Sequence, residues 1–125
     1  MQCARQEGYS LIEILAAVAI LAIAVLPLMG MFTAALRSAH FAQITSQAAF
    51  HGQALVEDVV AASGSTLSAL KASFERTLPV NIPNTQFAFT RHIDSHGTGL
   101  IRVTVVIYWT DGQGARQYRV VTLIE

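Results

Sequence analysis

Residues 14–32 form a continuous apolar run without a charged side chain, and this run restricts the folds open to the chain. As a helix it would be about 28 Å long at 1.5 Å per residue, close to the hydrocarbon thickness of a bilayer. One carboxylate, Glu13, directly precedes the run. A carboxylate at that depth costs roughly 2.5–3.5 kcal/mol on insertion scales, so Glu13 should have a function and a partner. The run therefore predicts a transmembrane helix.

The sequence around Glu13 has a specific pattern. Residues 8–15 read GYSLIEIL: a glycine, an aromatic residue, a serine, two aliphatic residues and the glutamate that opens the apolar run. This stretch resembles the start of the type IV pilin-like family, which includes pilins, minor pilins and type II secretion pseudopilins. In that family a membrane-embedded peptidase cuts after the glycine and methylates the new amino terminus.

The resemblance implies a role for each matching residue. Residues 1–8 would be a prepilin leader, cleavage would fall between Gly8 and Tyr9, and Tyr9 would be N-methylated. Glu13 would neutralise the terminal amine of a neighbouring subunit and set the register of assembly. Breaking such a pair in an apolar seam costs roughly 3–5 kcal/mol. The alternative is that Glu13 lies at the headgroup interface and extends its carboxylate into water.

The resemblance also implies partners and a location. The partners would be a prepilin peptidase and methyltransferase, other pilin or pseudopilin subunits, an inner-membrane assembly platform and membrane lipid. The chain would cross the bacterial inner membrane once, with its C-terminal domain in the periplasm, before it enters a pilus or pseudopilus. The charges leave this orientation open, because Arg5 precedes the run and Arg37 follows it. Small residues at Ala34 and Ala35 also leave signal-peptide cleavage after the run open.

One long helix is predicted over residues 11–62, because alanine and leucine dominate this stretch. Its first part, residues 9–35, would be the transmembrane and assembly helix, and residues 36–125 would be the periplasmic domain. Pro27 removes a backbone hydrogen bond and should bend or loosen the helix. Gly30 is a second weak point, and it stands where many members of the resembling family carry a kink-forming proline.

Beyond Arg37 the helix becomes amphipathic. Apolar residues recur at three-, four- and seven-residue steps and form a stripe that should cover the C-terminal sheet, consisting of Phe41, Ile44, Ala48, Leu55 and Val59. Gly52 falls on the same stripe and would let another backbone approach. Gly64 should end the helix. A short second helix is then predicted over residues 67–77, followed by an irregular connection that contains Pro79 and Pro83.

The last third of the chain changes to a period of two. This pattern predicts strands over residues 85–93, 100–109 and 115–124, with a hairpin turn at residues 110–114. The core face of the middle strand should consist of Val103, Val105, Ile107 and Trp109. Three short strands need an apolar cover, which the amphipathic part of the long helix can supply. The predicted fold class is therefore α+β, with a long N-terminal transmembrane helix packed against a small C-terminal antiparallel sheet, as in pilins.

The sequence predicts no catalytic residues, no metal site and no cofactor. His40 and His51 lack a carboxylate or cysteine that would complete a ligand set between them. His92 and His96 flank Asp94, but a polar strand edge and turn explains these residues equally well. An enzyme is therefore the least favoured class.

Nucleic acid is a further partner that the sequence raises. The predicted strands carry arginines that could bind phosphates if they shared one exposed face, namely Arg91, Arg102, Arg116 and Arg119. The chain has eight basic and eight acidic residues, so its net charge gives no support for a broad nucleic-acid footprint. The alternative is that each arginine is an ordinary outward-facing strand residue.

Two classes of function remain. The first is a minor subunit of a type IV pilus or pilus-like filament, with a type II secretion pseudopilin as its variant. The only cysteine, Cys3, lies in the leader, so a disulfide-closed major pilin is disfavoured. Residues 102–112 are similar to PilV-like minor pilins, and residues 47–57 to I-type pseudopilins. The second class is a statically anchored binding module, such as a DNA-uptake receptor, which would need no leader removal.

Overall fold

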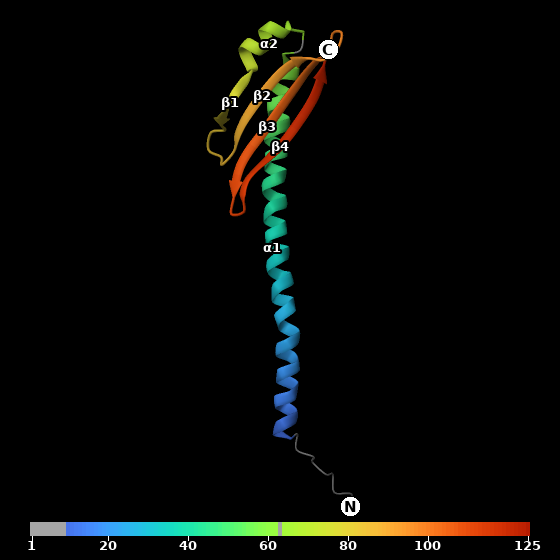
Figure 1. Ribbon diagram of the computed structural model, residues 1–125, viewed down its shortest axis with the longest axis vertical. Helices are drawn as coiled ribbons and strands as arrows, with labels where there is room; N and C mark the ends of the chain where they lie inside the picture. Colours follow the sequence, from blue (N-terminus) through green and yellow to red (C-terminus); the bar gives the residue numbers. More distant parts are fainter. Residues whose placement is uncertain (1–9, 63) are drawn as a thin grey trace, which may run out of the picture. The chain divides into compact units, whose positions relative to one another are not determined.

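The computed structural model describes residues 10–62 and 64–125 (Figure 1). Its elements, in chain order, are α1 (Leu11–Ala61), α2 (Leu67–Phe74), β1 (Arg76–Asn81), β2 (Ala88–Ser95), β3 (Ile101–Asp111) and β4 (Gly114–Ile124). The chain divides into two compact units, one up to Phe41 and one from Ala42 to Glu125. The predicted class is confirmed: a long N-terminal helix and a C-terminal antiparallel sheet form an α+β fold.

The first unit contains the N-terminal part of α1. Every residue from 10 to 43 is exposed in the structure. Among the described residues, α1 holds the one segment that is long and apolar enough to cross a membrane, and none of that segment is buried. The rest of the described chain therefore does not bury these side chains. This is expected of side chains that face lipid or neighbouring subunits.

α1 ends at Ala61, within the segment that was predicted to stop it. Gly64 has a φ of 102°, the left-handed conformation that commonly ends a helix. The next helix, α2, begins after Thr66 and ends at Phe74, so the predicted end at residue 77 is wrong.

The residues after α2 form a strand that the sequence did not predict. β1 pairs antiparallel with β2, although its register shifts between Arg76 and Val80. All of its residues are exposed, so it lacks the apolar alternation that normally identifies a strand. Pro79 is tolerated because β1 lies at the edge of the sheet, where one side of the backbone needs no partner. The expected irregular connection was therefore wrong in part, and the sheet has four strands.

The remaining strands match the predicted alternation. The strand order is β1-β2-β3-β4, and β3 pairs with β4 from Ile101↔Ile124 to Asp111↔Gly114. The hairpin forms at the predicted place. Its turn is supported by Asp111, whose Oδ1 accepts a hydrogen bond of 2.8 Å from the Gln113 N–H. The residue that needs a positive φ is Gly114, at 127°, rather than Gly112.

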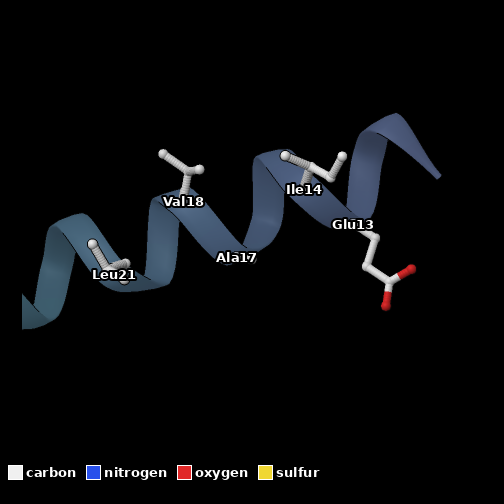
Figure 2. Close-up of a pocket in the computed structure, with 5 residues that line it drawn as sticks. All are labelled: Glu13, Ile14, Ala17, Val18 and Leu21. Carbon is white, nitrogen blue, oxygen red and sulfur yellow. The ribbon is translucent and has the colours of Figure 1, made fainter. Parts of the chain in front are cut away.

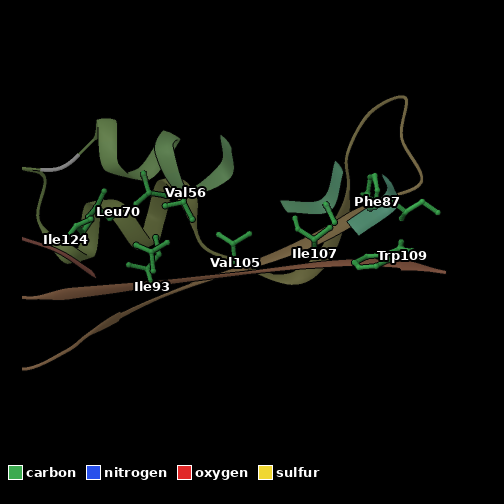
Figure 3. Close-up of a cluster of buried hydrophobic side chains, with 12 residues drawn as sticks. Val56, Leu70, Phe87, Ile93, Val105, Ile107, Trp109 and Ile124 are labelled. Atoms are coloured by element: carbon green, nitrogen blue, oxygen red, sulfur yellow. The ribbon is translucent and has the colours of Figure 1, made fainter. Parts of the chain in front are cut away.

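The core of the second unit lies between residues 42–61 of α1, α2 and one face of the sheet (Figure 3). The predicted core face of β3 is confirmed, since all of its members are buried: Val103, Val105, Ile107 and Trp109. On α1 the buried residues are Ile44, Ala48, Gly52, Val56 and Val59. The predicted stripe was therefore partly wrong, because Phe41 is 46% exposed and the buried Val56 was not predicted, whereas Leu55 is half-buried and packs against the core.

Gly52 lies close to side chains of the sheet. A Cβ atom at this position would lie 2.9 Å from Val120 Cγ2 and 3.7 Å from Ile107 Cγ1. The sequence predicted that another backbone approaches Gly52; the groups nearest to it are instead side chains of the sheet.

Candidate assembly site

The first turn of α1 places Glu13 at the helix start. Ser10 precedes the helix, and its carbonyl accepts hydrogen bonds from the N–H groups of Glu13, at 2.8 Å, and Ile14, at 3.3 Å. A carboxylate in the first turn interacts favourably with the positive end of the helix dipole. The local sequence therefore gives Glu13 a fixed position on α1 whether or not another group binds its carboxylate.

Glu13 borders a shallow apolar groove on the helix surface (Figure 2). The groove is lined by side chains one helical turn apart: Glu13, Ile14, Ala17, Val18 and Leu21. Glu13, Ala17 and Leu21 follow one another at intervals of four residues, and the small Ala17 side chain leaves the hollow between them. Figure 2 shows the Glu13 carboxylate directed away from the helix axis.

The Glu13 carboxylate has no cationic partner within residues 10–62 and 64–125. The groove beside it is apolar, and the side chains that line it are exposed. An unpaired carboxylate beside an apolar surface can bind a cation that comes from outside the described chain. Gly8 and Tyr9 lie outside the described residues, so leader cleavage and N-methylation there remain predictions.

The predicted weak points lie within an unbroken helix. α1 is assigned as one helix through Pro27 and Gly30. Pro27 has no N–H to donate to the carbonyl four residues earlier. Near Gly30, the Thr33 hydroxyl donates a hydrogen bond of 2.9 Å to the Gly30 carbonyl. A bend or loosened segment at this place stays a prediction.

The arginines considered for nucleic-acid binding are divided between the two faces of the sheet. Arg91 and Arg116 lie opposite Val105 and Trp109 of the core face of β3. Arg102 and Arg119 occupy the alternate positions, on the other face of the sheet. Arg116 is engaged within the hairpin, since its Nε donates to Asp111 and its Nη2 to Gln113. The fold therefore does not bring the four arginines together.

Arg91 is a buried structural residue with 5% exposure. Its guanidinium carbon lies 5.6 Å from the centroid of the Phe74 ring and 5.5 Å from that of Phe89. Its Nη2 is 4.0 Å from Asp58 Oδ2 on α1. Burial lowers the pKa of Arg91, the nearby Asp58 raises it, and Arg76 lowers it. Neither sequence expectation for Arg91, a phosphate-binding residue on an exposed face or an ordinary outward-facing strand residue, is correct, because the side chain is buried.

The histidines do not converge on a metal site. Within the described part of the chain, no three histidine, cysteine, aspartate or glutamate side chains are grouped so that they could hold a metal ion. The His51 ring packs instead against Phe50 and Phe87, with centroid separations of 5.9 Å and 5.5 Å. Asp94, between His92 and His96, lies 3.6 Å from Lys71 Nζ.

Comparison with known proteins identifies the N-terminal feature. Residues 3–29 match the model of the prokaryotic N-terminal methylation motif. The motif, with the long apolar helix and the α+β fold, defines a type IV pilin-like protein with a prepilin methylation motif. No curated protein and no solved structure matches the chain.

Three general properties follow from this class. The methylation motif implies processing by a prepilin peptidase. The single N-terminal apolar helix is consistent with an inner-membrane prepilin that is assembled into a pilus-like filament. Pilin-like proteins are structural rather than catalytic.

Proposed function

We propose that this protein is a minor subunit of a type IV pilus or pilus-like filament. The observation that carries the proposal is the Glu13 carboxylate, which lies beside an exposed apolar groove and lacks a cationic partner within residues 10–62 and 64–125. Residues 3–29, which include Glu13, match the prokaryotic N-terminal methylation motif and support this proposal. An apolar helix that begins with an unpaired carboxylate needs a neighbour that supplies both an apolar surface and a cation.

The neighbouring subunit would supply both. After cleavage between Gly8 and Tyr9, the methylated Tyr9 amine of one subunit would bind Glu13 of another. The surrounding apolar side chains exclude water, so a subunit shifted along its neighbour would leave a charge unpaired at a cost of roughly 3–5 kcal/mol. The pair would therefore select one register among the many that an apolar helix surface permits.

The proposed organisation has three parts. Residues 1–8 are the leader, residues 9–35 are the transmembrane and assembly helix, and residues 36–125 are the periplasmic domain. Pro27 and Gly30 would let the helix bend when the subunit leaves the bilayer for the filament. The inner-membrane platform and the other filament subunits would be partners in that transfer.

A type II secretion pseudopilin is the alternative, since residues 102–112 resemble PilV-like minor pilins whereas residues 47–57 resemble I-type pseudopilins. The two share processing, helix packing and register, so the distinction concerns the filament that the subunit enters. A statically anchored DNA receptor is less well supported, because Arg91 is buried and Arg116 is engaged within its own hairpin.

The N-terminal peptide of the membrane-extracted protein tests the proposal. Mass spectrometry should find a chain that begins at N-methylated Tyr9. A Gly8→Glu variant should retain the leader, whereas a Gly30→Ala variant should be processed like the wild type. An intact start at Met1, or a cut near Ala35, would contradict the proposal and favour an anchored or secreted binding domain.

A further inference from the structure

The two edges of the sheet differ in their protection against pairing with another strand. β1 and β4 form the edges (Figure 1). β1 is short, contains Pro79, and shifts register against β2 between Arg76 and Val80. Prolines and register irregularities are devices that stop an edge strand from accepting another strand. The β1 edge is therefore poorly suited to strand addition.

The β4 edge has none of these devices. β4 pairs with β3 without a register shift along its whole length and contains neither proline nor lysine. The side of β4 that does not pair with β3 lies at the edge of the sheet. A long and regular edge strand presents a row of backbone groups that can pair with an additional strand.

The side chains of β4 define what a partner strand must carry. Val120 contacts the helix side at Gly52, so the alternate residues Arg119, Val121 and Leu123 lie on the opposite face. Val121 and Leu123 are 53% and 49% exposed. Arg119 is exposed and forms no ion pair with any residue in 10–62 or 64–125.

Cross-strand neighbours on one face stabilise a sheet when apolar residues face apolar residues and opposite charges face each other. A strand beside β4 should therefore place apolar side chains next to Leu123 and Val121 and an acidic side chain next to Arg119. If the partner strand pairs antiparallel to β4, as all neighbouring strands of this sheet do, its sequence from the N-terminal end would be apolar, any residue, apolar, any residue, acidic.

A second copy of the chain is a poor source of this strand. β1 has no acidic side chain and would bring Arg76 towards the arginines of β4. Residues 121–125 do fit the pattern, but β4 would then pair antiparallel with β4 of the second copy. Residues 42–61 of α1 and β4 run towards the same end of the sheet domain (Figure 1). The two copies of this part of α1 would therefore run in opposite directions, which does not suit two subunits that enter from one membrane.

We propose that the β4 edge is a strand-addition site for an extended segment of a different polypeptide with this apolar–apolar–acidic alternation. Main-chain hydrogen bonds would hold the segment, and Arg119 would select for its acidic side chain. The inference concerns only the sheet domain, so it does not depend on leader processing or on filament assembly.

The experiment uses the purified full-length chain in detergent and two synthetic peptides. The acidic probe carries two valines and a glutamate at alternate positions, and the basic probe carries lysine in place of the glutamate. The acidic probe should bind roughly fivefold to tenfold more tightly, because an opposite-charge pair replaces a like-charge pair. Its binding should slow amide exchange in β4 and leave β1 unchanged.

Variants separate strand addition from non-specific adsorption. Arg119→Glu should reverse the preference between the two probes, and Val121→Lys should weaken both. Leu78→Lys is the matched control, since it places the same charge on the exposed outer residue of the other edge strand and should leave binding unchanged. Thermal unfolding of each variant shows that the sheet domain remains folded.

Three results would overturn the proposal. The first is equal binding of the two probes to the wild-type chain. The second is an amide-exchange change that appears at β1 instead of β4. The third is dimerisation of the chain alone that Arg119→Glu abolishes and a further Glu125→Arg change restores, since that would make a second copy the occupant.

Discussion

Gly52 of α1 faces Val120 of β4 so closely that a methyl group added at residue 52 would lie 2.9 Å from Val120 Cγ2. Real Cβ atoms essentially never approach to this distance, so a side chain at residue 52 would need α1 or the Val120 side chain to shift. Val120 is β-branched and cannot withdraw by rotating a flexible chain end.

Gly52→Ala should therefore destabilise the sheet domain. Overpacking of a well-packed core costs roughly 1–3 kcal/mol, and the higher helix propensity of alanine offsets about 1 kcal/mol of this loss. Adding Val120→Ala should recover part of the loss because it removes the opposing methyl groups. Chemical denaturation of the single and double variants measures the coupling. Gly30→Ala, whose Cβ would meet open space, is the control; equal effects at the two glycines would contradict the packing argument.

Arg91 should stabilise the fold mainly through its packing between two rings. Arg91→Ala would leave a cavity between Phe74 and Phe89 and should cost about 2–3 kcal/mol. Arg91→Met should recover most of this loss, because an unbranched apolar side chain can fill the same space. Urea unfolding of the two variants measures the difference.

Asp58→Asn tests the charge contribution at the same place. The Asp58 side chain is 65% exposed and its Oδ2 lies 4.0 Å from Arg91 Nη2, so the pair should contribute less than about 1 kcal/mol. If Asp58→Asn were more destabilising than Arg91→Met, the ion pair rather than the packing would be the dominant interaction.

Asp111 should make the hairpin sensitive to acid. The Gln113 backbone N–H, which donates to its carboxylate, lowers the pKa of Asp111, and Arg116 lowers it further. Because the folded pKa is below the unfolded value, the stabilisation is present at neutral pH and is lost as pH falls through the folded pKa. Amide exchange at Gln113 should therefore accelerate in acid. Asp111→Asn should make this acceleration smaller; an unchanged pH profile would exclude Asp111 as its source.

Glu13→Ala should separate maturation from assembly. The variant keeps Gly8 and Tyr9, so the leader should still be removed and Tyr9 methylated. It lacks the carboxylate that would bind a neighbouring amine, so the processed chain should remain in the membrane fraction and be absent from sheared filaments. Ser10→Ala serves as the nearby control. Normal incorporation of Glu13→Ala would show that the register does not depend on this carboxylate.

Pro27→Ala tests the proposed bend. Restoring an N–H at residue 27 would complete the helical hydrogen bonding and raise the helix propensity of this segment. We expect lower incorporation into filaments with unchanged processing. Filament yield, measured against the processed membrane pool, provides the readout; unchanged yield would count against a role for helix loosening.

The long helix and the three C-terminal strands could be predicted because their apolar residues repeat with clear periods. β1 could not be predicted, since its six residues are all exposed and the strand depends on β2 for its pairing. The burial of Arg91 was not predicted, and one of the two rings that cover it, Phe74, comes from α2 and is distant from β2 in the sequence pattern. The burial of Val56 was also missed, although Val56 lies four residues after Gly52 on the same side of α1.

The candidate site was predicted more fully than the packing of the sheet domain. Glu13 is conspicuous as the one charge at the start of a long apolar run, and this needs no tertiary information. The groove formed with Ala17 and Leu21 could be found only once the helix was built, because it depends on the direction of each side chain along the helix.

α1 is one continuous helix that belongs to two compact units. Substitutions along it should therefore be limited by different properties before and after residue 42. In the first part, where the rest of the chain does not bury the helix, one apolar residue should be replaceable by another. A polar residue should not be tolerated there. In the second part, where Ala48 and Gly52 are buried against the sheet, a change of volume should be refused even when polarity is kept. Hydrophobicity would thus limit substitutions in one half of the helix, and side-chain volume would limit them in the other half.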